Sequence, residues 1–295
     1  MSEMTIVPDI YIIGAQKSGT TTLYDWLAQH PQIYGHPLAK DHPFFANERV
    51  YHEGLETFRS FSQKAPKGSF VLGGEANAMY APAGAQRMFH TIPCTRLIAI
   101  LRNPVQRAYS AYSYAVERMM EDRTLDQAIR DELDGIRYME EDALQRDYLE
   151  HGNYAFQLRE IHKFFSKDQV YVMILEEVMK NPKHELRELF RFIGVSEDFE
   201  PDLTVRNETK GGYRSKWIAK IIYARPSSKF VSKLGKVIFP FSIRTAIRRF
   251  LAEVNRVERA KPEFPEHVRQ RMKEYYKDEI LDLEELLGRE IEVWK

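Results

Sequence analysis

A short stretch near the start of the chain combines two glycines, one lysine and three consecutive threonines. It reads Gly14-Ala-Gln-Lys-Ser-Gly-Thr-Thr-Thr22 and lies between an apolar run at 9–14, typical of a strand, and a helical pattern at 21–29. The N–H groups of such a loop, together with the N-terminus of the helix that follows, bind anions, and threonine hydroxyls add donors. The stretch therefore predicts a site for a phosphate-like anion, against the alternative of a plain strand-to-helix turn with capping threonines.

One position separates this loop from the phosphate loop of nucleotide kinases. Gly14 and Gly19 keep the spacing G-x-x-x-x-G, and Thr21 occupies the hydroxyl position of that motif. Thr20 replaces the lysine that reaches the β- and γ-phosphates, and the only lysine of the loop, Lys17, comes three residues earlier. The sequence also shows no obvious apolar strand that ends in a Walker-type aspartate, so a nucleotide kinase is the alternative and not the leading hypothesis.

A second cluster follows the most apolar segment of the chain. The run 96–101 reads as a central strand and is followed by Arg102, and Asn103-Pro104 then opens a helical pattern that contains Ser110. An arginine fork at a strand end and a hydroxyl on the next helix can point into one crevice and bind a dianion. Taken singly, the two residues would be an ordinary loop arginine and helix serine.

Together the two clusters resemble the donor site of sulfotransferases that use 3′-phosphoadenosine 5′-phosphosulfate (PAPS), in the bacterial and heparan-sulfate-sulfotransferase-like branch. The resemblance implies transfer of a sulfuryl group by in-line displacement, with 3′-phosphoadenosine 5′-phosphate (PAP) as product and no metal. The acceptor would be a hydroxyl, in preference to an amine, of a carbohydrate, lipid or small molecule. A non-catalytic nucleotide-binding protein on the same scaffold stays an alternative. The implied donor ligands are Gln16, Lys17, Ser18, Gly19, Thr20, Thr21, Thr22, Arg102 and Ser110, with Lys210, Gly211 and Arg214 as weaker matches.

The resemblance also implies which group removes the acceptor proton. Lys40-Asp-His-Pro-Phe-Phe45 resembles a Lys-Glu-Pro-His-Phe-Phe segment whose glutamate is the base, so Asp41 takes that place with a side chain one methylene shorter. Proline and histidine are exchanged, which puts His42 directly after it as a second candidate, with an unperturbed pKa of about 6.5. Glu75, in a segment similar to Gly-Glu-x-x-Pro-x-Tyr, is the third candidate.

Two lysines complete the expected catalytic group. Lys17 is expected to neutralise the charge that grows on the bridging oxygen as the donor bond breaks. Lys40 would assist it or orient the acceptor. Ala76 and Asn77 stand where many relatives have a lysine, which weakens the case for an acidic polysaccharide as acceptor.

The charges of the chain cancel in total but are segregated. The chain has 43 Lys and Arg and 43 Asp and Glu, yet 206–250 holds twelve basic residues and a single acid. We expect this segment to be a basic helical insertion or lid over the acceptor. Peripheral contact with an anionic membrane and a plain surface helix are its alternatives. No reader motif supports nucleic acid as a partner.

Length, composition and element order predict a single α/β domain over 1–295. Apolar runs at 9–14, 69–75, 96–102 and 169–175 alternate with helical patterns, which favours a P-loop-like, mostly parallel central β-sheet flanked by helices. Such sheets bind ligands beyond the carboxyl ends of their strands. The single cysteine allows neither a disulfide nor a multi-thiolate zinc site, and no signal peptide or spanning segment is evident, so we expect a soluble cytoplasmic protein.

Overall fold

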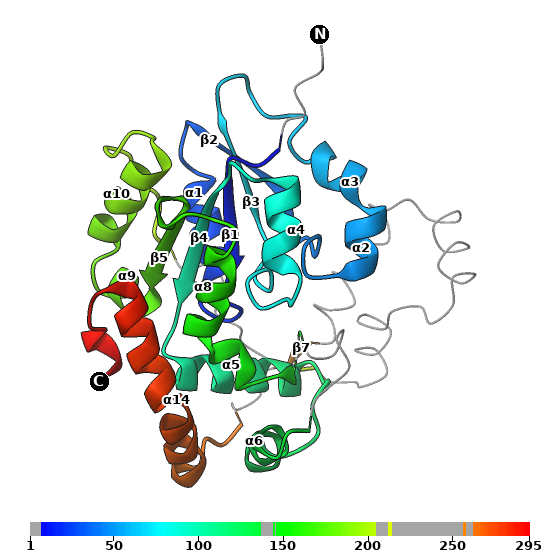
Figure 1. The fold of residues 1–295 in the computed structure, drawn as a ribbon, viewed down its shortest axis with the longest axis vertical. Helices are drawn as coiled ribbons and strands as arrows, with labels where there is room; N and C mark the ends of the chain where they lie inside the picture. Colours follow the sequence, from blue (N-terminus) through cyan, green and yellow to red (C-terminus); the bar gives the residue numbers. More distant parts are fainter. Residues whose placement is uncertain (1–6, 137–143, 145, 205–211, 214–255, 258–261) are drawn as a thin grey trace.

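Five strands form one parallel sheet in the computed structural model of the chain (Figure 1). The structure describes residues 7–136, 144, 146–204, 212–213, 256–257 and 262–295. In sheet order the strands are β2 (Ile33–Lys40), β3 (Phe70–Gly74), β1 (Ile10–Gly14), β4 (Arg96–Leu101) and β5 (Val170–Ile174), and every neighbouring pair is parallel. The predicted α/β fold with a parallel sheet is thus confirmed, because the four apolar runs at 9–14, 69–75, 96–102 and 169–175 are β1, β3, β4 and β5.

The strand β2 is missing from the sequence prediction. Its segment contains Gly35 and Pro37, which weaken the signature of a strand. The structure places β2 at the edge of the sheet, where one side of the backbone needs no partner, and its pairing with β3 shifts register between Gly35 and Lys40. An edge strand tolerates both residues for that reason. Lys40 is therefore the last residue of a strand.

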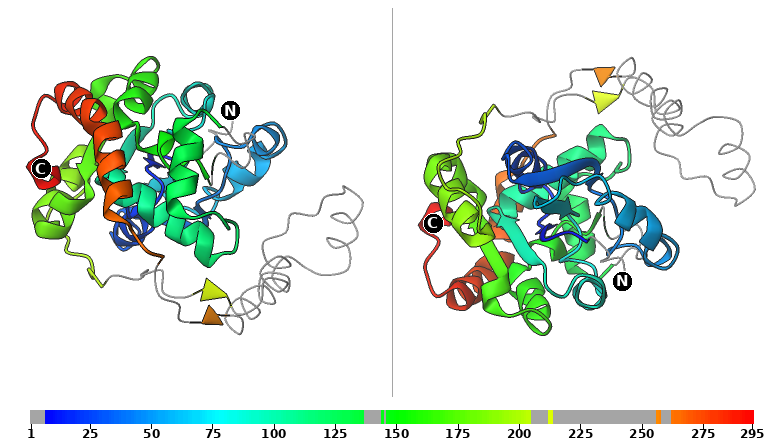
Figure 2. Two further views of the ribbon diagram at one scale, coloured as in Figure 1. Left: turned by 90° about the horizontal axis from the view of Figure 1, so that it is seen from below. Right: turned by 90° about the horizontal axis from the view of Figure 1, so that it is seen from above.

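Helices cover both faces of the sheet, because alternate residues of each buried strand point to opposite sides. Ile10, Ile12, Ile98 and Ile100 pack with α1 (Thr20–Leu27), α9 (Leu175–Lys180) and α10 (Pro182–Ile193). Tyr11, Ile13, Leu97 and Ala99 pack with α4 (Gly84–Thr91), α8 (Tyr154–His162) and the end of α14 (Glu266–Leu287). Figure 2, which looks along the strands, shows α1 and α8 on opposite sides of the sheet.

The remaining elements surround this core. The helix α5 (Pro104–Glu117) packs with α6 (Leu125–Leu133) and the first half of α14 in a cluster of its own. The helical patterns expected to begin at 21 and 104 are confirmed as α1 and α5, to within one residue. Within the described residues, the other elements are α2 (Glu48–Glu53), α3 (Leu55–Ser60), three short 3₁₀ helices (Glu150–Gly152, Lys167–Gln169, Glu292–Trp294) and the antiparallel pair β6 (Gly212–Tyr213) and β7 (Arg256–Val257).

The chain leaves the central strands β1 and β4 in opposite directions. From β1 it passes through α1 to β2 at one edge of the sheet, and from β4 it leads through α5 to β5 at the other edge. Such a change of direction between adjacent strands is where open α/β sheets bind ligands, at the carboxyl ends. Both candidate donor clusters follow these two ends.

The basic segment 206–250 lies outside the described residues, apart from the two residues of β6. The expectation that it forms a lid or membrane face, and the weaker donor ligands Lys210, Gly211 and Arg214, therefore stay predictions. In the part of the chain that the structure describes, no helix is both long enough and apolar enough to cross a membrane.

Candidate functional site

The loop after β1 is shaped to present N–H groups at the start of α1. Lys17 and Gly19 both have left-handed backbones, with φ of 68° and 89°, and Gly19 is the N-cap of α1. Ala15 N donates to Ile100 O at 2.8 Å, which fastens the loop to β4. No side chain caps α1 within the described residues, and the first N–H groups of a helix have no partner inside it. The predicted anion site therefore has the backbone that it requires.

The polar side chains of the loop divide into inner and outer groups. Ser18 is fully buried and Thr20, the first residue of α1, is nearly so, whereas Thr21 and Thr22 are half-buried. Gln16 turns away from α1 and donates from Nε2 to Leu144 O at 2.9 Å. The hydroxyl donors thus lie at the helix start as expected, while Gln16 fastens the loop to a distant segment.

Lys17 is held over an aromatic ring. Its Nζ lies 4.1 Å from the ring centre of Tyr114, and the guanidinium of Arg118 lies 4.3 Å from the same centre. The pKa of Lys17 is lowered to about 8, first by burial and next by the charge of Arg118. Arg102 and Arg107 contribute to the lowering, and Glu117 opposes it. A lysine of this kind changes its charge near neutral pH, as groups at functional sites often do.

Arg102 lies directly against this loop. Its Nη1 donates to Lys17 O at 3.4 Å, and its own carbonyl accepts from the hydroxyl of Tyr154 at 2.9 Å. Burial lowers the pKa of Arg102, and the side chain keeps its charge because the ordinary value is so high. Ser110 is half-buried on α5, four residues before Tyr114 and hence on the same face of the helix. The structure thus brings the two predicted donor clusters together.

The expected acceptor side begins where β2 ends. Lys40 donates from Nζ to Asp25 Oδ1 on α1 at 3.2 Å, so it joins the end of β2 to α1. Asp41 has a left-handed backbone, with φ of 58°, and its N–H donates to Gly74 O at 2.8 Å. Asp41 is exposed, but nearby protein atoms partly desolvate its carboxyl group, and this desolvation raises its pKa. The charge of Lys40 and a hydrogen bond from the N–H of Ala76 oppose the rise.

His42 packs its ring edge-on against Phe61, with 5.1 Å between centres. Its Nε2 is buried without a partner among the described residues, and burial lowers the pKa of the ring. His42 is therefore neutral at physiological pH and keeps an unoccupied nitrogen.

Glu75, the third candidate base, is fully engaged with the backbone of the segment that carries the other two. Its Oε2 accepts from Phe45 N at 2.8 Å and its Oε1 from Ala46 N at 2.9 Å. Burial raises the pKa of Glu75 to about 8, although these two hydrogen bonds lower it, and the charge of Asp41 adds to the rise. The carboxyl group is buried and fastens Phe45 and Ala46, which lie shortly after Asp41 and His42 in the chain.

Three residues at this site were not found from the sequence. Tyr114 and Arg118 continue the helix face of Ser110 at intervals of four, which is the signal that could have pointed to them. Arg107 is completely buried and donates from Nη2 to Tyr148 O, while its Nε and Nη1 have no partner among the described residues. Nothing in its sequence position distinguishes it from a surface arginine.

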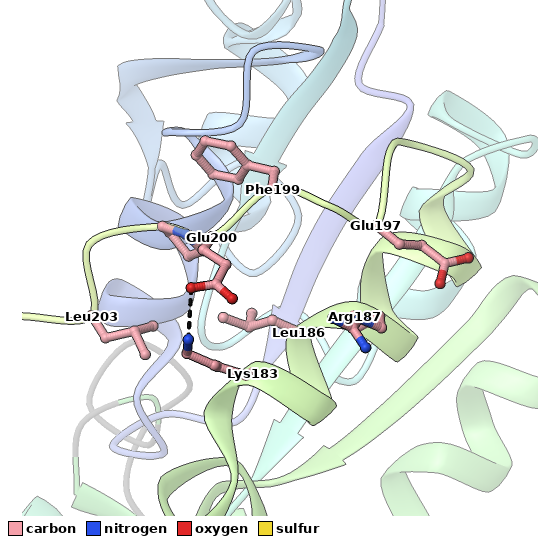
Figure 3. Close-up of a pocket in the computed structure, with 8 residues that line it drawn as sticks. Lys183, Leu186, Arg187, Glu197, Phe199, Glu200 and Leu203 are labelled. Atoms are coloured by element: carbon pink, nitrogen blue, oxygen red, sulfur yellow. Dashed lines mark hydrogen bonds and ion pairs between the residues drawn. The ribbon is translucent and has the colours of Figure 1, made fainter.

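A pocket elsewhere contains none of the candidate residues. It lies between α10 and the segment that follows it, and two of its lining residues, Lys183 and Glu200, form an ion pair of 2.7 Å (Figure 3). In the described part of the chain, no three His, Cys, Asp or Glu side chains gather in a way that could hold a metal ion.

Comparison with known proteins agrees with the fold and identifies the family. Residues 7–286 match the sequence profile of the sulfotransferase domain. The bifunctional heparan sulfate N-deacetylase/N-sulfotransferase 4 of Mus musculus is 28% identical over 198 residues, 64% of this chain but 22% of that protein. The heparan sulfate glucosamine 3-O-sulfotransferase 3B1 of Mus musculus is 26% identical over 70% of this chain and 50% of its own length. The chain thus spans half or less of the length of these two relatives.

A solved structure matches the whole chain. The sulfotransferase from Alicyclobacillus acidocaldarius superposes with a TM-score of 0.70 at 23% identity and covers 98% of this chain and 99% of its own. At that identity the match shows the fold alone. Because the family profile covers nearly all of the sequence, the chain belongs to the sulfotransferase domain family.

Proposed function

We propose that the chain transfers the sulfuryl group of PAPS to an acceptor hydroxyl, with PAP as product. The observation that carries the proposal is the meeting of the loop after β1 with Arg102 at the switch point of the sheet, where Arg102 Nη1 donates to Lys17 O. The site combines unpaired helix N–H groups with two cations and so matches a nucleotide that carries phosphate or sulfate at both ends. The 5′-phosphosulfate would lie on the loop and the 3′-phosphate between Arg102 and Ser110.

For sulfuryl transfer, the protein must mainly position the donor and the acceptor and stabilise the charge that develops. The acceptor oxygen attacks sulfur, the bond from sulfur to the bridging oxygen breaks, and negative charge grows on that oxygen. Lys17 is our choice for the cation that stabilises this charge, since its Nζ extends from the middle of the anion-binding loop.

The acceptor proton needs a base, and the contacts support Asp41. Its raised pKa makes its carboxylate a stronger base than an ordinary aspartate, and its side chain is open to solvent. His42, with a neutral ring and an unpartnered Nε2, is the second candidate. Glu75 holds the segment that carries both, so we assign it a positioning role.

The residues near Asp41 favour a neutral hydroxylated acceptor: a carbohydrate, lipid or small molecule. Lys40 is occupied by Asp25, and Ala76 and Asn77 bring no charge. The relatives named above are an N-sulfotransferase and a 3-O-sulfotransferase of heparan sulfate, so amines belong in the test as well. A cytoplasmic location, and a lid or membrane role for 206–250, stay predictions.

Calorimetry separates this function from that of a nucleotide kinase. We expect the protein to bind PAP and to bind ATP with Mg²⁺ far more weakly, since Thr20 replaces the triphosphate lysine. Submicromolar binding of ATP with no binding of PAP would refute the proposal. Transfer of labelled sulfate from PAPS to a panel of sugars, lipids, phenols and amines then distinguishes an enzyme from a binding protein. Lys17→Ala and Asp41→Asn are the matched variants.

A further inference from the structure

Tyr114 brings two positive charges to one ring. Lys17 reaches it from the loop after β1, at 4.1 Å, and Arg118 from the end of its own helix, at 4.3 Å. Both distances are well inside the range of about 6 Å over which an aromatic face attracts a cation. The ring therefore restrains a lysine side chain whose four-carbon stem would otherwise be free to move.

The contact is built on the same helix face as the donor cluster. Ser110 and Tyr114 lie four residues apart on α5, and Arg118, four residues further on, is the C-cap of this helix, so the three positions follow one face. At the other end of the contact, Lys17 has a left-handed backbone with φ of 68°. A non-glycine residue keeps that conformation where its surroundings hold it, and such positions gather at ligand sites.

The two cations also affect each other. Burial is the largest cause that lowers the pKa of Lys17 to about 8, and Arg118 is the next; Arg102 and Arg107 lower it too, and Glu117 raises it. Like charges held together lose stability that a bound anion restores. The arrangement is thus suited to a ligand with strong negative charge.

We propose that Tyr114 is a positioning residue that seats the Lys17 ammonium on its ring, and that Arg118 is a second cation of the phosphosulfate site. The role of Tyr114 follows from its contact with Lys17 alone, whereas the identity of the bound anion rests on the proposed function. In this arrangement Tyr114 orders Lys17 before the donor binds. Arg118 adds its charge where the 5′-phosphate is held.

The first test uses the ligand-free protein. The pKa of Lys17 Nζ is measured by NMR in full-length protein with isotope-labelled lysine, and Lys17→Arg identifies the signal. We expect Tyr114→Leu to lower this pKa and Arg118→Gln to raise it, each by about half a unit to one unit. Tyr114→Phe keeps the ring and Arg118→Lys keeps the charge, so both should leave it within about 0.3 units. If circular dichroism shows both variants to be folded and the pKa of Lys17 is the same in Tyr114→Leu and Tyr114→Phe, the Tyr114 ring does not position Lys17.

The second test measures PAP affinity against pH by calorimetry. Protonated Lys17 binds the anion, so wild-type affinity should be full below about pH 8 and fall above it. Arg118→Gln should weaken binding on the order of tenfold at pH 7 and move the fall to higher pH, while Arg118→Lys stays within about threefold. If Arg118→Gln binds PAP as tightly as wild type at both pH 6.5 and pH 9, Arg118 is not a second cation of the phosphosulfate site. Absence of PAP binding by the wild-type protein would instead refute the proposed function. The NMR measurement would still test whether Tyr114 positions Lys17.

Discussion

Glu75→Gln should change how the stability of the protein depends on pH. Glu75 is buried, its two carboxyl oxygens accept from Phe45 N and Ala46 N, and its pKa is raised from 4.5 to about 8. Burial is the main cause of the rise. The folded protein therefore holds this proton more tightly than the unfolded chain does between these two values.

The sign of the effect follows from that difference. The stabilising contribution of the protonated Glu75 is fully present below pH 4.5 and is lost as pH rises toward about 8. At about 1.4 kcal/mol for each pH unit, the loss is on the order of 3 to 5 kcal/mol of unfolding free energy. Glutamine carries no proton to lose, so the variant should lack this part of the pH dependence.

The substitution also lowers the free energy of unfolding by an amount that does not depend on pH, because one of the two backbone N–H groups would face the amide NH₂ of glutamine. An unsatisfied buried donor costs about 1–3 kcal/mol. We therefore expect Glu75→Gln to be less stable than wild type at pH 5, and equally or more stable at pH 8.

Urea unfolding at pH 5, 6.5 and 8, followed by circular dichroism, measures these free energies. Other buried carboxyls such as Glu132 and Glu279, each with a pKa raised to about 7 mainly by burial, contribute to both proteins and cancel in the difference. Glu53→Gln, at an exposed position on α2, is the control. A difference between wild type and Glu75→Gln that stayed constant from pH 5 to pH 8 would refute the reasoning.

Four further substitutions test the site. Lys17→Ala should lower the rate of sulfuryl transfer about 10²- to 10³-fold, as loss of a transition-state cation does, measured with labelled PAPS and compared with Lys17→Arg. Asp41→Asn should lower kcat about 10²- to 10⁴-fold while PAP binding by calorimetry is kept; full activity would exclude Asp41 as the base. Arg102→Ala should weaken PAP at least tenfold but leave adenosine 5′-phosphate nearly unchanged, and equal losses for both ligands would contradict its place at the 3′-phosphate. Lys40→Met should cost less than about 1 kcal/mol in urea unfolding, since the pair with Asp25 is partly exposed.

The four strands expected from the sequence were predictable because they are buried. A strand covered on both faces needs an unbroken apolar run, and β4 is such a run. The edge strand β2 escaped detection because Gly35 and Pro37 weaken its pattern, and an edge strand tolerates both since one side of its backbone needs no partner. The loop after β1 was equally readable, since its glycines and threonines act within a few residues of one another.

The roles of single side chains could not be read in the same way. Lys40 was expected near Lys17 or the acceptor, and its position beside Asp25 depends on how β2 packs against α1. Glu75 was a candidate base until its two backbone partners, thirty residues earlier in the chain, were placed. Distances between segments decide these contacts, and no local pattern encodes them.

By itself, the sequence determined the fold class, the loop between β1 and α1 and the resemblance to sulfotransferases, because each depends on residues that are neighbours along the chain. Only the tertiary structure decided that Lys17 lies on Tyr114 beside Arg118, that Arg102 contacts the loop, and that Glu75 fastens the segment of Asp41. Those facts depend on parallel strands that bring their carboxyl ends to one edge, where residues far apart in sequence meet.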